Sequence, residues 1–307
     1  MRFIKYLREF INAIRSVNSF ERILKKNLIV NQCQQSSIVS KKSGVEKYKA
    51  GTENLVVSLT TYSKRIFSVH LTIESLLNQT KMPNKLILWL AEDEFNDDNL
   101  PLVLVKQKER GLTVNFCKDI KSYKKLIPTL DDYADDAIVT VDDDVIYPYD
   151  FLEKLHRTHL SAPDCVCYYR GHKMKFLNVD TPAPYTTWLH CWEGIEKEID
   201  VLPTGIGGVL YPPKCFHDDV TNESLFMKLA PHGDDIWFKT MTLLNGVRTK
   251  RVVTFLPFSD EFIDVDGTQD IGLWKKNMGE GRNDEQVKAV FEYYKEDLKS
   301  LFPLGDK

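Results

Sequence analysis

Three consecutive aspartates, Asp142, Asp143 and Asp144, directly follow the apolar and β-branched run of residues 137–141. Carboxylates this close repel one another and raise one another's pKa, so a cation is needed beside them. The alternative is a turn that caps the helical stretch beginning at Phe151, but a cap requires only one aspartate. Three carboxylates fit better with a hard divalent cation, which takes carboxylate oxygens and leaves room for substrate phosphates.

The chain from Leu55 onward alternates between stretches typical of strands and stretches typical of helices. Strands are predicted over residues 55–62, 85–93, 112–117 and 137–141, and helices over residues 68–79, 98–111 and 122–134. Strands separated by helices of this length indicate a parallel sheet with helices on its faces. The strands are nearly continuous apolar runs, as expected when both faces of the sheet are covered.

Ligands of open α/β sheets bind outside the carboxyl ends of the strands, where Asp142, Asp143 and Asp144 would lie. The acidic pairs at 131–132 and 135–136 precede the strand, so we interpret them as solvated turn residues. After Cys165 the alternation fades, and residues 170–213 are rich in Gly, Pro, Trp and His. We expect this segment to form loops around a site rather than more sheet.

The N-terminal segment differs in character from the rest of the chain. Residues 1–30 carry seven Lys or Arg and two Glu, with apolar residues at helical spacing. A basic amphipathic helix of this kind can lie on an anionic membrane surface, although it can also pack on its own domain or on a second subunit. We therefore predict a helix over residues 1–30, a polar linker over 31–52 and one domain over 53–307.

The totals exclude several classes of protein. A net charge of −3 gives no general attraction to nucleic acid, and no apolar run approaches the length needed to span a bilayer. None of the six cysteines forms a CxxC pair or a zinc-finger spacing, which indicates reduced thiols in a cytosolic protein. We expect a cytoplasmic protein, with peripheral contact to the inner face of the cell membrane through residues 1–26.

The segment VTVDDDVIYP, residues 139–148, resembles the D-x-D segment of GT-A nucleotide-sugar glycosyltransferases. The glycine-rich segment 202–213 and the acidic pair Asp234 and Asp235 follow in the order found in those enzymes. Residues 55–255 are similar in layout to bacterial members of capsule and lipopolysaccharide pathways, near glycosyltransferase family 2. The resemblance implies a GT-A fold: a Rossmann-like α/β domain with a mixed, mostly parallel sheet, here preceded by the amphipathic helix.

The resemblance also implies a metal site. Asp142 would face the donor ribose and Asp144 would bind Mn²⁺ or Mg²⁺, while Asp143 would assist either, and the triple run leaves Asp142 as a second candidate ligand. A divalent ion that bridges two phosphates neutralises the leaving group. Many GT-A enzymes have a histidine after the acidic pair, but the last histidine here is His232, so the third protein ligand is absent or supplied by Asp264 or Asp266.

Further roles follow from the same resemblance. Asp235 would be the general base that takes the acceptor proton, with Asp234 as the rival. Without a chemical role, both would simply be carboxylates favoured by the helix dipole. The donor site would comprise Thr60, Tyr62, Arg65, Glu92 with Asp93, Lys125 in preference to Lys124, and the glycines Gly205, Gly207 and Gly208, although such a glycine cluster can also be only a tight turn or a bulge.

The acceptor side is less defined by the pattern. Trp188 and His190, with Trp192, would stack on sugar rings, but core packing explains an isolated Trp equally well. Residues 273–286 have glycines flanking basic residues and would form either a mobile lid over the diphosphate or a solvated loop before the final helix.

The reaction implied is an inverting, metal-dependent transfer of a hexosyltransferase type, from a nucleoside diphosphate sugar, a UDP-sugar, to a hydroxyl of a growing or lipid-linked glycan. A sugar-phosphate nucleotidyltransferase would need a glycine-rich phosphate loop after the first strand, and residues 58–65 contain no glycine. A catalytically silent, membrane-associated scaffold or glycan-binding protein would have no use for acidic residues at both 142–144 and 234–235.

Overall fold

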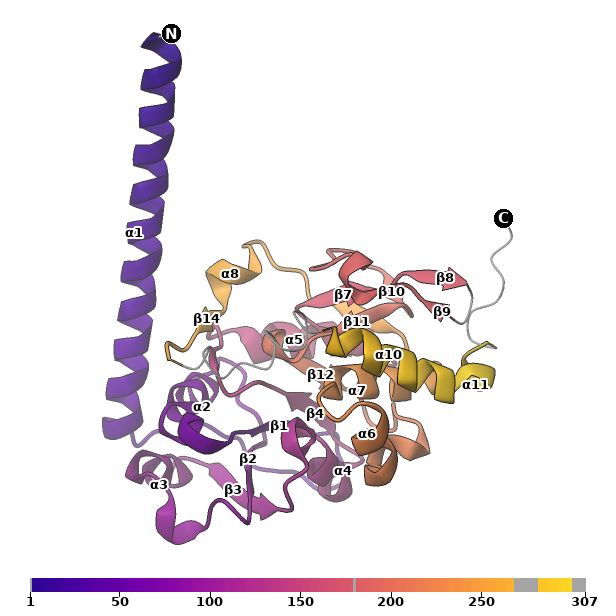
Figure 1. The fold of residues 1–307 in the computed structure, drawn as a ribbon. Coiled ribbons are helices and arrows are strands. Elements are labelled where there is room, and N and C mark those ends of the chain that lie inside the picture. The colour runs from indigo at the N-terminus through magenta and orange to yellow at the C-terminus, as the bar shows by residue number, and fades with distance from the viewer. Residues whose placement is uncertain (1, 179–180, 268–280, 300–307) are drawn as a thin grey trace.

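An eight-stranded sheet organises the computed structural model, which describes residues 2–178, 181–267 and 281–299 (Figure 1). Its strand order is β10-β13-β6-β12-β4-β1-β2-β3, and four of the seven neighbouring pairs are parallel. The strands are β1 (Leu55–Thr60), β2 (Lys85–Ala91), β3 (Leu112–Cys117), β4 (Ala137–Thr140), β6 (Val166–Tyr168), β10 (Lys197–Glu198), β12 (Val209–Tyr211) and β13 (Thr249–Arg251). The predicted α/β class, with a mixed and mostly parallel sheet flanked by helices, is confirmed.

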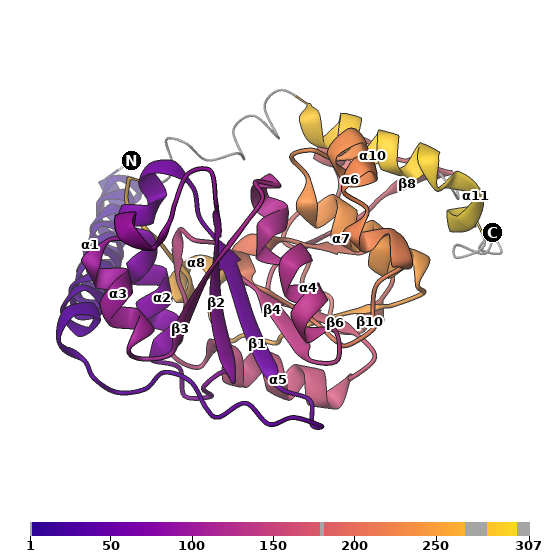
Figure 2. The same cartoon turned by 90° about the horizontal axis from the view of Figure 1, so that it is seen from below.

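The first half of the domain follows the predicted alternation. Strands β3, β2, β1 and β4 lie side by side (Figure 2), and the register pairs Leu55 of β1 with Ala137 of β4. The helices that join them are α2 (Val69–Leu77), α3 (Leu102–Lys108) and α4 (Ile127–Tyr133). Alternate strand residues face opposite sides: Val57 packs with α2 and α3, whereas Val56 packs with α4. Both faces of the sheet are therefore buried.

The second half contains more sheet than we predicted. Within residues 170–213 the structure places β12 in the main sheet, antiparallel to both β4 and β6, and pairs β7 (Gly171–Lys173) with β11 (Val201–Pro203). A further pair joins β8 (Phe176–Asn178) and β9 (Thr181–Pro182). The prediction of loops was wrong for these stretches because strands of two or three residues are too short to show an alternating pattern.

The remaining elements complete the layers around the sheet. They are β5 (Val145–Ile146), paired with β14 (Ile263–Asp264), the helices α5 (Phe151–Ser161), α6 (Glu223–Leu229), α7 (Asp234–Leu244), α8 (Phe258–Glu261), α10 (Arg282–Tyr293) and α11 (Lys295–Lys299), and the 3-10 turns η1 (Ser63–Phe67), η2 (Asp97–Asn99), η3 (Lys121–Lys125), η4 (Tyr185–Thr187), η5 (Gly205–Gly207) and η6 (Asp218–Thr221).

The N-terminal helix, α1 (Arg2–Val39), is longer than predicted and extends well beyond the domain (Figure 1). The linker that we placed at residues 31–52 therefore begins after Val39. Cys33 and Ser37 are buried, and Cys33 packs against Leu71 and Ile146. The exposed polar residues between them masked this contact in the sequence. Within the described ranges, no helix combines the length and apolarity that crossing a membrane requires.

A buried ion pair fastens the segment after α1 to the domain. Arg110 Nη1 lies 2.6 Å from Glu74 Oε2, and both side chains are almost completely inaccessible. Arg110 Nε also donates to the carbonyl oxygen of Lys42 at 2.9 Å, and the Gly44 amide donates to the carbonyl oxygen of Arg110. Because a buried charge without its partner is strongly destabilising, this pair fixes the linker where it crosses α2 and α3.

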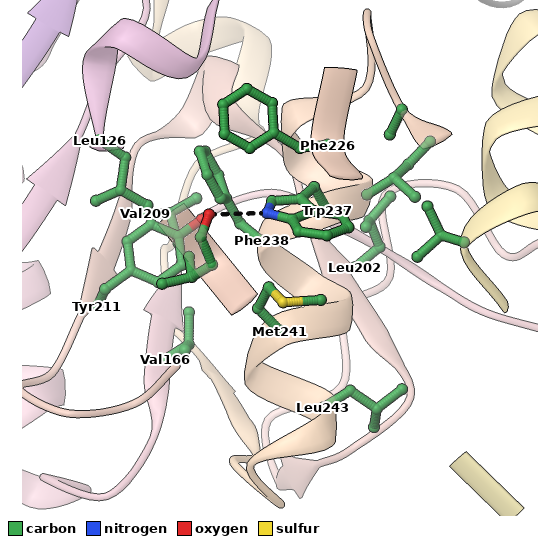
Figure 3. Close-up of a cluster of buried hydrophobic side chains, with 14 of the residues drawn as sticks. Leu126, Val166, Leu202, Val209, Tyr211, Phe226, Trp237, Phe238, Met241 and Leu243 are labelled. Atoms are coloured by element: carbon green, nitrogen blue, oxygen red, sulfur yellow. Dashed lines mark hydrogen bonds between the residues drawn. The ribbon is translucent and has the colours of Figure 1, made fainter. Parts of the chain in front are cut away.

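Helix α7 is anchored by an aromatic cluster around Trp237 (Figure 3). The Trp237 side chain is fully buried, contacts Phe226 edge-on and donates from Nε1 to the carbonyl oxygen of Val220 at 3.0 Å. Phe238 and Met241, on the same helix, are also fully buried. This packing matters for the site because Asp234 and Asp235 open the same helix.

We expect Trp237→Ala to lower the free energy of unfolding by about 3–5 kcal/mol, because it leaves a cavity and an unpaired carbonyl group in the core. Urea titration followed by circular dichroism measures this change. Tyr149→Ala removes an aromatic ring that is 70% exposed and should change stability by less than about 0.5 kcal/mol. Equal urea midpoints for the two variants would contradict the anchoring role of Trp237.

Candidate active site

A cavity of about 1010 Å³ opens beyond the carboxyl ends of β1 and β4. Its wall brings together segments that are far apart in sequence: residues 60–62 after β1, residues 141–144 after β4, residues 204–206 around η5, and the first residues of α7. Parallel strands end at the same edge of a sheet, and this edge is where ligands bind in such folds. The structure thus places both acidic clusters on one cavity.

The middle aspartate of the triplet is enclosed by the β1 side of the cavity. Arg65 Nη1 lies 2.6 Å from Asp143 Oδ1, and Thr61 Oγ1 donates to Asp143 Oδ2 at 2.5 Å. Burial still raises the pKa of Asp143, because it outweighs the attraction of Arg65. Arg65 Nη2 also reaches Asp144 Oδ2 at 3.1 Å. Asp143 and Arg65 therefore join the loops after β1 and β4, and Asp143 is not exposed to a ligand as Asp144 is.

Lys125 serves the other end of the triplet. Its Nζ lies 3.0 Å from Asp142 Oδ1 and 2.8 Å from Asp234 Oδ2, in a buried position. Burial alone would lower the pKa of this ammonium group, but the surrounding carboxylates outweigh burial and raise that pKa well above its usual value. Lys124 turns away from this cluster and pairs with Asp119. Both lysines line the cavity, and Lys125 bridges two carboxylates of the protein, so its assignment to the donor stays a prediction.

Gly205 is the glycine that the site requires. Its amide donates to Asp235 Oδ2 at 3.0 Å, and a Cβ at this position would lie 2.7 Å from Asp142 Oδ1 and 2.8 Å from Lys125 Nζ. A side chain at this position would displace the ends of Asp142 and Lys125 from their ion pair, so glycine lets the η5 backbone approach the charged cluster as it stands.

Gly207 and Gly208, which we assigned to the donor site, do not line the cavity. Gly208 has a φ of +73°, and a Cβ there would lie 2.5 Å from the Phe151 ring. Gly207 is the last residue of η5, and Gly208 follows it at the turn into β12. The donor-binding prediction for them was wrong because glycines required for a turn and for a ligand look the same in a sequence.

The part of the cavity where the two acidic clusters meet contains more negative than positive charge. Asp142, Asp143, Asp144, Asp234 and Asp235 surround two buried cations, Arg65 and Lys125. Burial and repulsion from its two neighbours raise the pKa of Asp144 to about 7, against the effect of Arg65. Burial, opposed by Lys125 and reinforced by Asp234 and Asp142, raises the pKa of Asp235 to about 7. Two carboxylates are therefore poised to take either a proton or an added cation.

The acidic set fits a divalent ion only in part. Carboxylate oxygens suit Mg²⁺ and Mn²⁺, and the uncompensated charge favours a cation. However, within residues 2–178, 181–267 and 281–299 no three His, Cys, Asp or Glu side chains are placed to hold a metal ion together. Asp264 lines the cavity and contributes to the raised pKa of Asp144, whereas Asp266 pairs with Lys26. A metal here would need further oxygens from a bound ligand, as Mg²⁺ commonly takes them from phosphates.

The two acidic residues of α7 have different surroundings. Ser122 Oγ donates to Asp234 Oδ1 at 2.8 Å, and Lys125 occupies the other oxygen of Asp234. Asp235 is partly accessible, and among the residues that the structure describes, the backbone amide of Gly205 donates a hydrogen bond to its Oδ2. Asp235 is thus the member of the pair that can exchange a proton with a molecule in the cavity.

Thr60 and Tyr62 line the cavity as predicted, but Glu92, Trp188 and His190 do not. Glu92 is exposed to solvent, and Glu94, two residues later, lines the wall and accepts from the Ser63 amide. The ring of Trp188 is buried and donates from Nε1 to the carbonyl oxygen of Ala183. The assignments of Glu92 and Trp188 were wrong, since the sequence does not show which side of a turn faces a cavity.

Two aromatic residues that contact His190 and Trp188, namely His172 and Tyr185, line the main cavity instead. His190 is exposed and lies with Trp192 in a separate shallow pocket, but its ring contacts His172 with centroids 4.4 Å apart. His172 and Tyr185 line the main cavity, together with Arg170, Thr204, His232 and Asn283. The concentration of aromatic and histidine residues in 170–213 was the signal for these positions, but it did not identify the individual residues.

Helix α1 also reaches the cavity, which the sequence did not indicate. Arg22, Lys25 and Lys26 line its mouth, opposite α8. Most of the lid that we predicted over residues 273–286, including its two lysines, lies outside the described residues.

No protein-family model matches the chain, and no curated protein matches it. Among solved structures, S. aureus TarS is similar with a TM-score of 0.42 and 15% identity, over 71% of this chain and 37% of that chain. S. aureus TarS 1-349 in complex with UDP is similar with a TM-score of 0.43 and 14% identity, over 71% of this chain and 62% of that chain. The chain thus spans less than two thirds of the length of either neighbour.

The raised pKa of Asp235 has a consequence for stability. Its ionised form is penalised in the folded state, so the protein loses stability as pH rises from about 4 to about 7. Asn keeps the oxygen that accepts from Gly205 but cannot ionise. We therefore expect Asp235→Asn to raise the free energy of unfolding by about 2–4 kcal/mol at pH 8 and to leave it nearly unchanged at pH 4.

Urea titrations at the two pH values measure this difference, with Asp98→Asn as the control because Asp98 is exposed and remote from the cavity. A stabilisation of Asp235→Asn that is the same at both pH values would show that Asp235 has an ordinary pKa.

Proposed function

We propose that the chain is a metal-dependent glycosyltransferase that moves a sugar from a nucleoside diphosphate sugar, a UDP-sugar, to a hydroxyl of a growing glycan. One observation carries the proposal: Asp235, whose pKa is raised to about 7, faces the same cavity as the charge-rich Asp142 and Asp144. A base of near-neutral pKa and an acidic site for a cation-bound diphosphate are the two groups that such a transfer needs.

The donor diphosphate would lie against the β4 edge of the cavity. Asp144, with Asp142 as the second ligand, would hold Mn²⁺ or Mg²⁺ together with phosphate oxygens, and the ion would neutralise the charge that develops on the leaving group. Thr60 and Tyr62 line the wall beside it, where the nucleoside would bind. The cation also explains why the protein keeps a site with so much uncompensated negative charge.

The acceptor would enter on the side of α7 and react by direct displacement with inversion. Its hydroxyl oxygen forms a bond to the anomeric carbon while the bond from that carbon to the diphosphate oxygen breaks. The hydroxyl proton goes to the free oxygen of Asp235, and the nucleoside diphosphate leaves with the bonding electron pair. Asp234 is already paired with Ser122 and Lys125, which supports Asp235 as the base.

Lys125 would act through the carboxylates that it contacts. Because its ammonium group is buried between Asp142 and Asp234, it keeps the donor side and the acceptor side of the cavity at a fixed separation. It also limits the rise in the pKa of Asp235, which must lose its proton to act as a base. This role replaces the direct contact with the donor that the sequence suggested for Lys125.

The acceptor would be a surface glycan of the capsule or lipopolysaccharide type, carried on a lipid. His172 and Tyr185 lie at this wall with only a small part of each ring exposed. Arg170, held by Thr204 Oγ1 at 3.0 Å, offers hydrogen-bond donors. Mixed aromatic and polar walls of this kind are usual for ligand sites. Reaction at a cytoplasmic membrane surface would bring such an acceptor to the cavity.

We expect UDP with Mn²⁺ or Mg²⁺ to stabilise the folded protein by about 2.7 kcal/mol at concentrations 100-fold above Kd. Thermal unfolding measures the shift. Asp144→Asn should remove the metal-dependent part, because one carboxylate ligand is lost, and Asp98→Asn should keep it. If UDP raises the melting temperature equally in the presence of a chelator, Asp142 and Asp144 do not bind a metal.

For catalysis, we expect Asp235→Asn to lower the transfer rate by about 10²–10⁴-fold while UDP binding stays unchanged. The wild-type rate should rise with pH through about 7 and then level off, because only the ionised carboxylate accepts a proton. Full turnover by Asp235→Asn would exclude Asp235 as the base.

A screen of nucleotide sugars with and without Mn²⁺, read as nucleoside diphosphate release, identifies the donor.

A further inference from the structure

The part of α1 between residues 17 and 28, which we call its free part, has an exposed apolar face. Val17, Phe20, Leu24 and Leu28 are 64%, 68%, 48% and 61% exposed. Their spacing of three, four and four residues puts them on one side of the helix. Large apolar side chains that recur on one face, rather than singly, indicate a surface that another apolar body covers.

This face points away from the domain. The residues through which α1 contacts the domain include Lys26, which pairs with Asp266, and the buried Cys33 and Ser37. Leu24 lies two residues from Lys26, which is about 200° around an α-helix. The apolar face is therefore opposite the packed face, and folding of this chain does not bury it.

A second apolar element lies beside α1. Val253, Phe255 and Leu256 are 54%, 98% and 50% exposed and directly precede α8. Arg22 Nη2 lies 2.7 Å from Asp260 Oδ1 of α8, and Lys25 Nζ donates to the carbonyl oxygen of Asp260 at 3.0 Å. These contacts bring the apolar loop and the free part of α1 to the same region. Figure 1 shows α8 on the side of the domain that lies nearest α1.

The same elements form the mouth of the cavity. Arg22 and Lys25 of α1, and Phe258, Ser259 and Asp260 of α8, line it. Residues 253–256 thus lie beside the entrance through which an acceptor would reach Asp235, and the apolar face of α1 lies on the side of that helix that points away from the domain.

The charge of this region selects the kind of surface that covers it. Residues 1–30 hold seven Lys or Arg and two Glu, although the chain as a whole carries −3. Positive charge is therefore concentrated on the helix that bears the apolar face. An amphipathic helix with aromatic and aliphatic residues on one side and basic residues around it binds anionic lipid surfaces through both effects.

We propose that α1 and residues 253–256 form a docking surface for an anionic lipid bilayer, with the cavity mouth opening at the membrane surface. The docking stands on these observations alone; only the delivery of a lipid-carried acceptor to the cavity rests on the proposed function. A second copy of α1 is the alternative occupant of this face, and light scattering distinguishes it from a bilayer.

Flotation of the full chain with vesicles tests the proposal. Vesicles of phosphatidylcholine with phosphatidylglycerol should carry the protein upward, vesicles of phosphatidylcholine alone should carry much less, and added salt should weaken binding. Leu24→Glu and Phe255→Glu should each lower the bound fraction about tenfold, because each puts a charge into the apolar face. Leu102→Glu makes the same change at a leucine of α3 that is 71% exposed, and it should bind like the wild type.

Leu24 and Phe255 are exposed, so circular dichroism should show that both variants fold normally. The proposal is overturned if the full chain does not float, or if Leu24→Glu floats as well as the wild type. It is also overturned if light scattering shows a dimer that Leu24→Glu dissociates and that does not bind vesicles. Nucleotide-sugar hydrolysis measured without vesicles tests the proposed function separately, since neither residue lines the cavity.

Discussion

Two buried cations, Arg65 and Lys125, hold four carboxylates at the carboxyl edge of the sheet, and the arrangement of the site depends on them. Arg65 links the loop after β1 to Asp143 and Asp144, and Lys125 links Asp142 to the start of α7. A buried charge that loses its partner costs several kcal/mol, so these pairs strongly restrict where the loops can lie. The cations that the acidic triplet requires are therefore part of the protein itself.

The two cations neutralise only part of the negative charge, and the remaining charge is located at Asp144 and Asp235. Asp143 and Asp234 are each held by a cation and a hydroxyl donor, while Asp144 and Asp235 keep pKa values raised to about 7. The protein thus places destabilised carboxylates where a cation and a proton would be received. Stability that is given up at a site in this way is a common property of active sites, because the same groups gain interactions when ligands bind.

Close approach of backbone and charge completes this arrangement. The η5 turn presents the Gly205 amide to Asp235, and the lack of a Cβ lets the turn pass Asp142 and Lys125 without displacing their side chains. The packing of Trp237 keeps α7 in register behind it. Farther out, Arg22, Lys25 and Lys26 of α1 and Phe258, Ser259 and Asp260 of α8 line the cavity.

The sequence by itself determined the first four strands, the helices between them and the edge at which a site would form. These features depend on local patterns, namely apolar runs of strand length, helical spacing and an acidic triplet directly after a strand. The acidic triplet at Asp142 and Asp144 was visible in this way, whereas Asp235 and Lys125 were proposed only because of the resemblance to GT-A enzymes.

Only the tertiary structure decided how these residues divide their roles. Lys125 contacts Asp142, 17 residues away along the chain, and Gly205 contacts Asp235, 30 residues away. Such distant contacts decide whether Lys125 meets a ligand or two carboxylates, and whether Gly205 or Gly208 borders the cavity. The short strands of residues 170–213, the continuation of α1 to Val39 and the wrong assignments of Glu92 and Trp188 have the same origin. Each is set by contacts between distant segments, and the energies of such contacts leave no periodic signal in the local sequence.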